Sequence, residues 1–179
     1  MFLIVASLVV VDQLSKYIVK STMYLGQSIS VIGDFFRLTY VENPGMAMGI
    51  RFSNQTVFFG FSIIAVILVF YYLYKIRNEG WILQLALSFI TAGAIGNLTD
   101  RFIYGKVVDF LDFDFFNIHL PSFSLLGFNT PAFNLTRWWV FNVADMAVSG
   151  GMILIVIYIL FEGDPLKKTS KTAVNSTNV

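Results

Sequence analysis

Four long apolar runs constrain this chain more than any other feature of its sequence. They cover Met1 to about Val19, Thr56 to about Tyr74, Trp81 to about Leu98, and Trp139 to about Phe161. A helix needs about 20 apolar residues to cross the hydrocarbon core of a bilayer. Within lipid, backbone polar groups find partners only in helices or closed barrels. The runs therefore predict an α-helical membrane protein with four transmembrane helices.

Composition excludes several kinds of chemistry. Of the 179 residues, 56% are hydrophobic and 13% are charged, whereas a soluble domain carries about 25% charged residues. The net charge of +1 argues against a nucleic-acid partner. The chain has no cysteine and only one histidine, His119, which leaves no thiol nucleophile and none of the usual zinc sites.

Basic residues predict the orientation of the helices. The loop over residues 75–80 contains two of them, and the polar C-terminal segment over residues 165–179 contains three. Under the positive-inside rule, that loop and both ends of the chain face the cytoplasm. We expect one membrane-embedded domain over residues 1–164 and a disordered cytoplasmic tail over residues 165–179.

The two long loops, residues 20–55 and 101–137, then face outward. In the first loop, Ile29–Ile32 and Phe35–Val41 flank a Gly-Asp turn signal, which predicts a small antiparallel extracytoplasmic β-sheet at the membrane surface. The second loop is rich in aromatic residues, and these concentrate at the lipid–water boundary. We expect it to form a surface loop that partly covers the site.

Polar residues occupy one face of three of the four helices. Spacings of three, four and seven residues place each set on one side of its helix. Such faces turn inward, because a polar group that faces lipid has no partner. The three sets are Asp12, Ser15 and Lys16 in the first run, Asn97, Asp100 and Arg101 at the end of the third, and Asn142, Asp145 and Ser149 in the fourth.

Asp109 and Asp145 are the most informative pair within this polar cluster. Asp109 follows the third run in the segment Val107–Phe110. A helix that begins at Trp139 would carry Asp145 about 9 Å below the outer surface. Carboxylates in such surroundings are costly and mark functional sites. Two that share one proton can activate water and polarise a carbonyl, which predicts hydrolysis that requires no metal.

Structural interpretations remain open for the same residues. Asp145 could be a packing group held by a neighbouring helix, and Asp109 could be a solvated loop acid. Asp112 and Asp114 are rival partners for a carboxylate pair, although we expect both to face water.

The other polar residues, and the small residues near them, also have purely structural interpretations. Asp12 and Lys16 are spaced i, i+4 and could simply neutralise each other. Asp100 and Arg101 could anchor a helix end. Gly93 and other small residues could permit close helix packing, or could line a narrow approach for a substrate.

Five motifs occur in order along the chain. They are Asp12 to Lys16, Asn43-x-Gly45-x-Ala47, Gly96 to Arg101, Val107 to Phe110, and Phe141-Asn142-x-Ala144-Asp145. In this order, on a frame of four spans, they resemble the motif set of lipoprotein signal peptidase, also called signal peptidase II. The resemblance implies an intramembrane aspartyl protease, an aspartic endopeptidase that removes the signal peptide from bacterial prolipoproteins. It would cut just before a cysteine that carries diacylglycerol.

The resemblance also implies roles for individual residues. By motif position, the catalytic dyad falls on Asp109 and Asp145. The implied partners are a lipid-modified prolipoprotein and membrane lipids, with no cofactor, and we expect a monomer. The implied location is the bacterial cytoplasmic (inner) membrane, with the site toward the outer face. The substrate-binding or supporting residues are Asp12, Lys16, Asn43, Gly45, Asn97, Asp100, Arg101, Asn142 and Ala144.

The sequence departs from the family in two places. Met48 stands where an aromatic residue is usual, and the stretch between Asp109 and Asp145 is longer than is typical. These departures concern the loops, and they leave the positions of the two aspartates unchanged.

A transporter and a membrane scaffold are the alternatives to a protease. A small proton-coupled transporter would also bury carboxylates, but transporters place their sites near the midplane between repeats. This chain has no internal repeat, and its polar cluster is one-sided. A non-catalytic membrane scaffold predicts that Asp109 and Asp145 tolerate substitution by Asn.

Overall fold

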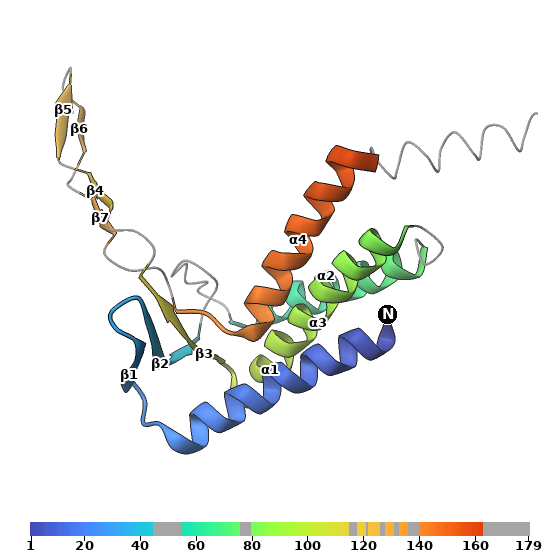
Figure 1. Cartoon of the computed structure of the whole chain (residues 1–179), viewed down its shortest axis with the longest axis horizontal. Helices are drawn as coiled ribbons and strands as arrows, with labels where there is room; N and C mark the ends of the chain where they lie inside the picture. Colours follow the sequence, from blue (N-terminus) through green and yellow to red (C-terminus); the bar gives the residue numbers. More distant parts are fainter. Residues whose placement is uncertain are drawn as a thin grey trace, which may run out of the picture.

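In the part of the chain that a computed structural model describes, four long helices form the body of the protein. They are α1 (Phe2–Thr22), α2 (Gln55–Lys75), α3 (Trp81–Tyr104) and α4 (Val143–Glu162). Figure 1 shows the helices gathered together, with a small β-sheet at one end. The structure describes residues 1–44, 55–75, 80–114, 118–120, 122–125, 128–130, 133–135 and 140–162.

The helices have the length and surface of membrane spans. Within the described residues, α1, α3 and the segment Val143–Phe161 are long and apolar enough to cross a membrane, and α2 contains the shorter apolar stretch Ile63–Tyr72. Large apolar side chains such as Leu14, Ile67 and Leu160 are exposed on the outer faces of the helices. A surface of this kind suits lipid better than water. The expected α-helical membrane fold is confirmed.

Helix α3 packs against α1, α2 and α4, and glycines allow the close approach to α4. A Cβ atom on Gly93 would lie 2.2 Å from the backbone oxygen of Ala144, and one on Gly151 would lie 2.5 Å from the backbone oxygen of Ala86. Both helices therefore need glycine where they cross. The packing role expected for Gly93 is confirmed, and Gly93 lines no open approach.

The sheet has three antiparallel strands in the order β1-β2-β3. These are β1 (Ser28–Ile32), β2 (Phe36–Asn43) and β3 (Val107–Phe113). The expected hairpin of β1 and β2 is present. Apolar side chains of the sheet, including Tyr40 and Phe110, pack against Val19 and Met23 at the end of α1. This cluster fixes the sheet to the helical body.

Strand β3 was not expected, because the sequence predicts a loop around Asp109. The four residues Val107–Phe110 are all buried, so the strand lacks the alternation of apolar and polar residues that marks a half-buried strand. Asp112 is also buried and accepts a hydrogen bond from the Thr39 hydroxyl at 2.6 Å. The expectation that Asp112 faces water was therefore wrong.

Two helix ends differ from the sequence-based boundaries. Helix α3 continues to Tyr104, where Gly105 ends it in the left-handed conformation with φ of 72°. Helix α4 begins at Val143 instead of Trp139, because Phe141 pairs with the backbone of Leu111 in β3. Asp145 consequently lies in the first turn of α4, closer to the start of that helix than the expected boundary at Trp139 placed it.

The long segment between β3 and α4 contains two short strand pairs. Strand β4 (Ile118–Leu120) pairs with β7 (Phe133–Leu135), and β5 (Phe123–Leu125) pairs with β6 (Phe128–Thr130). Figure 1 shows these four strands reaching away from the helices beyond β3. The second long loop was expected to cover part of the site, whereas its four described strands extend away from the helices. The expected tail over residues 165–179 lies outside the described residues.

Candidate active site

The predicted polar residues meet where the sheet joins the helices. Strand β2 supplies Asn43, β3 supplies Asp109, α3 supplies Asn97, and the start of α4 supplies Asn142 and Asp145. The sheet is essential to this arrangement, since two of the five side chains come from strands.

Asn142 is fully buried and connects the two aspartates. Its side-chain Nδ2 donates to Asp109 Oδ1 at 2.6 Å. Its backbone N–H donates to Asp145 Oδ2 at 3.2 Å, and its Oδ1 accepts the backbone N–H of Asp145 at 3.0 Å. Both carboxyl groups therefore bind Asn142: Asp109 binds its side chain, and Asp145 binds its backbone N–H.

The exchange between Asn142 and Asp145 is a capping box. Asn142 precedes the first residue of α4, and Asp145 is three positions further along. In this motif the cap side chain bonds the N–H at the third helical position, whose own side chain bonds back to the cap N–H. The start of the helix therefore fixes the orientation of the Asp145 carboxylate.

Asp109 lies in a buried setting that favours its protonated form. Its side chain accepts a hydrogen bond from Asn43 Nδ2 at 3.2 Å in addition to the bond from Asn142. The pKa of Asp109 is raised from 3.8 to about 7, first by burial and then by the negative charge of Asp145, while Asn142, Asn43 and Lys16 oppose the shift. A carboxyl group with this pKa can hold a proton near neutral pH.

Asn97 links the two aspartates to the rest of the polar cluster. Its Nδ2 donates to Asp145 Oδ1 at 2.7 Å, and its Oδ1 accepts a hydrogen bond from Asn142 Nδ2 at 3.0 Å. Arg101 Nη1 donates to the backbone oxygen of Asn97 at 3.4 Å. The Arg101 guanidinium lies within electrostatic reach of both Asp109 and Asp145.

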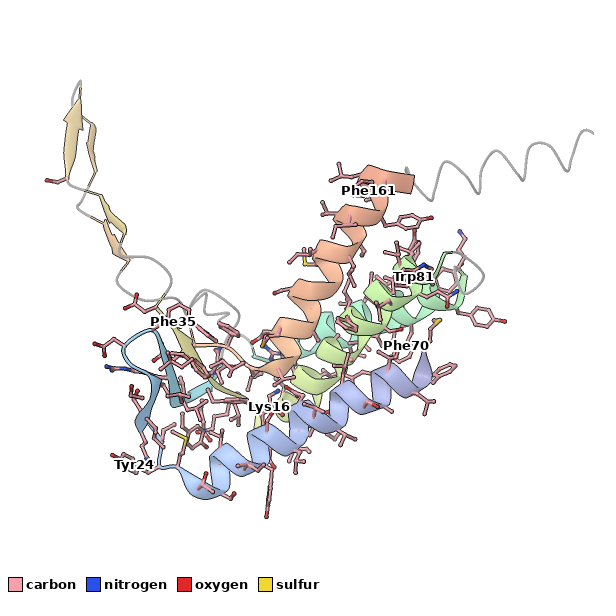
Figure 2. All side chains as sticks on the ribbon, in the orientation of Figure 1. Lys16, Tyr24, Phe35, Phe70, Trp81 and Phe161 are labelled. Atoms are coloured by element: carbon pink, nitrogen blue, oxygen red, sulfur yellow. The ribbon has the colours of Figure 1, made fainter. Side chains whose placement is uncertain are left out.

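A buried group of charges supports the site from α1 and α3. Lys16 Nζ lies 2.9 Å from Asp12 Oδ2 and 3.0 Å from Asp100 Oδ2. Figure 2 shows Lys16 where α1 passes the start of α4. Gln13 also belongs to this group, although it was not predicted as a site residue. Its Nε2 donates to Asp100 Oδ1 at 2.9 Å and to the backbone oxygen of Gly96 at 3.1 Å. The signal that could have identified Gln13 is a polar amide side chain within an apolar run.

Not every predicted residue joins this cluster in the described structure. Gly45 lies outside the described residues. Ala144 is buried, and its N–H donates to Asp12, which suits a supporting role. Asp112 lies an odd number of residues from Asp109 on β3, so the two side chains point to opposite faces of the sheet.

Within the described residues, no group of three or more histidine, cysteine, aspartate or glutamate side chains is arranged to hold a metal ion. The site therefore offers carboxyl groups and amides as its reactive and hydrogen-bonding groups.

Comparison with known proteins identifies relatives across most of the chain. A family model described as Signal peptidase (SPase) II matches residues 4–161. A lipoprotein signal peptidase from Moorella thermoacetica is 37% identical over 155 residues, which cover 86% of this chain and 89% of that protein. One from Staphylococcus aureus is 36% identical over 158 residues, which cover 88% of this chain and 86% of that protein.

Solved structures agree with this relationship. Two bacterial membrane enzyme structures, obtained by the in meso method at 1.9 Å and 2.3 Å resolution, each align with a TM-score of 0.69 and 35% sequence identity. The alignments cover 89% of this chain and 92% and 86% of the respective solved chains. On the evidence of sequence and structure together, the chain belongs to the signal peptidase II family of aspartic-type peptidases.

Proposed function

We propose that this protein removes the signal peptide from bacterial prolipoproteins, with Asp109 and Asp145 as its catalytic dyad. Family membership supports the substrate class. The observation that carries the assignment of the dyad is the binding of both carboxyl groups by the single residue Asn142. The bond to be hydrolysed is the peptide bond just before a cysteine that carries diacylglycerol.

The proposed reaction uses one water molecule and one shared proton. The unprotonated carboxylate takes a proton from water as the water oxygen bonds to the carbonyl carbon. The protonated carboxyl donates to the carbonyl oxygen at the same time. The tetrahedral intermediate then breaks its C–N bond. One carboxyl group of the dyad gives a proton to the departing amine, and a hydroxyl of the intermediate gives its proton to the other carboxylate, which leaves a carboxylic acid and restores the shared proton. The pKa of about 7 for Asp109 supports a dyad with one proton near neutral pH.

The amide side chains have complementary roles in this scheme. Asn142 and Asn97 hold the carboxyl groups through N–H donors, so that the reacting oxygens keep fixed positions. Asn43 approaches Asp109 from β2. A dyad held in advance avoids the cost of reorganisation during the reaction. We infer that these three residues position the dyad, and that Arg101 supplies positive charge beside it.

The position of the cluster suits a lipidated substrate. It lies where the apolar helices meet the sheet, and this junction would bring the peptide bond to a membrane boundary while the acyl chains stay in the bilayer. From the basic residues of the loop and tail we place both termini in the cytoplasm. The site then faces the outer side of the bacterial cytoplasmic membrane, and we propose that the protein acts as a monomer.

A direct cleavage assay tests this function. Purified protein in detergent is mixed with a synthetic prolipoprotein peptide that carries diacylglycerol on its cysteine, and the products are identified by mass spectrometry. Cleavage just before the lipidated cysteine, unchanged by a chelator, is the expected result. The same peptide without lipid serves as the control. Equal cleavage of both peptides, or activity that requires a metal, would overturn the proposal.

A further inference from the structure

Lys16 lies at the centre of the buried charges. Hydrogen bonds connect it to Asp145 through Asn97, and to Asp109 through Asn97 and Asn142. The Lys16 side chain is only 4% exposed. Its Nζ contacts Asp12 Oδ2 at 2.9 Å, Asp100 Oδ2 at 3.0 Å and Asn97 Oδ1 at 3.0 Å. An ammonium group has three protons to donate and no lone pair to accept. The three acceptors therefore engage all three N–H bonds of the ammonium group.

The contact with Asn97 determines which way that amide points. Asn97 Oδ1 receives Lys16 Nζ and Asn142 Nδ2, both at 3.0 Å, and the opposite end of the amide donates to Asp145 at 2.7 Å. In a flipped amide, Nδ2 would face the ammonium, and two donors would oppose each other. Its oxygen would meanwhile face the Asp145 carboxylate. The ammonium excludes that arrangement.

The same polarity continues through Asn142. Because Asn97 offers an oxygen, Asn142 must present its Nδ2 to Asn97, and the second proton of that group goes to Asp109 Oδ1 at 2.6 Å. The oxygen of the Asn142 amide is then left to accept the backbone N–H of Asp145. The contact with Lys16 therefore determines which atoms of Asn97 and Asn142 act as donors, and in this arrangement each aspartate receives an N–H donor.

The two carboxylate partners of Lys16 also hold the backbone beside each aspartate. Asp12 Oδ1 accepts the N–H of Ala144 at 2.8 Å, and Asp100 Oδ2 accepts the N–H of Val108 at 3.0 Å. Ala144 directly precedes Asp145, and Val108 directly precedes Asp109. One ammonium therefore joins the two carboxylates that fix the chain on either side of the site.

We propose that Lys16 is a positioning residue, whose ammonium sets the donor direction of the Asn97–Asn142 network so that both dyad carboxyl groups meet N–H donors. The inference rests on the proposed function of Asp109 and Asp145 as the dyad. Without the ammonium, Asn97 Oδ1 loses one of its two N–H donors, and the amide is held less firmly in this orientation. An amide that turns away withdraws its N–H donor from Asp145, and the two carboxyl groups lose their fixed relative position.

Cleavage kinetics of Lys16→Met test this role. We expect kcat to fall about 10- to 100-fold, the scale seen when a residue that orients a ligating group is lost, with KM changed by less than about twofold. Adding Asn97→Ala to Lys16→Met should cost no more than Asn97→Ala alone, because both changes remove the same interaction. Losses that multiply independently would overturn the inference.

The pH dependence of kcat gives a readout that mere structural support would not move. The charged groups that act on Asp109 are Lys16 from α1, Arg101 from α3 and Asp145 from α4. Among these, Lys16 lowers the pKa of Asp109. Lys16→Met should therefore move the alkaline limb of the profile to higher pH. An unmoved limb would contradict the proposal.

A second variant covers the case in which two uncompensated carboxylates prevent folding. Asp12→Asn combined with Lys16→Met removes one charge of each sign and keeps an Oδ1 acceptor for the N–H of Ala144. Its kcat should show the same loss as Lys16→Met and the same lack of additivity with Asn97→Ala.

Lys20→Met is the matched control for the lost charge. Lys20 is exposed one turn further along α1, and its ammonium lies 3.5 Å from the centre of the Tyr104 ring. This variant should keep kcat within about twofold. A folded Lys16→Met enzyme with unchanged kcat would reject the role of Lys16. Failure of the unmodified protein to cleave would instead reject the proposed function.

Discussion

Asn142 and Asp145 exchange two hydrogen bonds across the first turn of α4, and the amide of Asn142 reaches Asp109 with a third. The residue that caps the helix is therefore also the residue that joins the two acids. Helix formation and the geometry of the site depend on the same side chain, so substitutions at Asn142 can separate the two effects.

The first prediction concerns Asn142→Asp and Asn142→Ala. Aspartate is as good a helix cap as asparagine, but it lacks the Nδ2 donor and adds a third negative charge. We expect Asn142→Asp to fold and to lose about 100-fold or more in activity, as when a preorganised donor is removed. Asn142→Ala should also lose about 1 kcal/mol of stability with the cap. Thermal unfolding in detergent and cleavage rates measure the two effects, and wild-type cleavage by Asn142→Asp would contradict this account.

The second prediction concerns pH. With a pKa of about 7 for Asp109, cleavage should decline as the pH rises through about 7, because the dyad loses its shared proton. Asn43 lowers this pKa through its hydrogen bond. Asn43→Ala should therefore move the alkaline limb to higher pH. Thr39→Val, which removes a hydrogen bond to Asp112, is the control and should leave the limb in place.

The third prediction concerns stability, which depends on the same proton. Between pH 3.8 and about 7 the folded protein keeps a proton on Asp109 that the unfolded chain has lost. Folding stability contributed by this group should therefore decrease as the pH rises through that window. In Asp109→Asn the decrease should be smaller, which unfolding measurements across the window would show. An identical pH dependence in both proteins would disagree with the raised pKa.

The fourth prediction concerns the crossing of α3 and α4. In Gly93→Ala the new methyl group would meet the Ala144 backbone oxygen at 2.2 Å, so α4 must shift together with its first turn. We expect a loss of about 1–3 kcal/mol, typical of overpacking, together with reduced cleavage. Gly150→Ala is the matched control, since its nearest neighbour is a Phe89 ring atom at 3.6 Å. Equal stability of both variants would argue against this close crossing.

The sequence predicted the membrane helices and the β1–β2 hairpin, because apolar length and a Gly-Asp turn are local signals. It did not predict β3, whose residues Val107–Phe110 are buried without alternation. Nor did it place the start of α4, since the backbone pairing of Phe141 with Leu111 is a contact between distant parts of the chain. The pattern Asn142-x-x-Asp145 was nevertheless a readable capping signal.

For the candidate site, the sequence predicted residues that share a helical face, but it did not predict contacts between different helices or strands. Spacing placed Asp12 and Lys16 on one helical face, and the structure pairs them at 2.9 Å. Spacing could not show that Lys16 also binds Asp100 and Asn97, because those contacts depend on how α1 packs against α3. The burial of Asp112 was missed for a similar reason, since its partner Thr39 lies on another strand.

The most direct test of the dyad compares Asp109→Asn, Asp145→Asn and Asp112→Asn in the cleavage assay with the diacylglyceryl peptide. Asparagine keeps the shape of the side chain and removes its acid–base function. Asp109→Asn and Asp145→Asn should fold and each lose about 1,000-fold or more in kcat. Asp112→Asn should retain activity, because Asp112 points away from Asp109 and binds Thr39. Undiminished cleavage by either of the first two variants would contradict the proposed dyad.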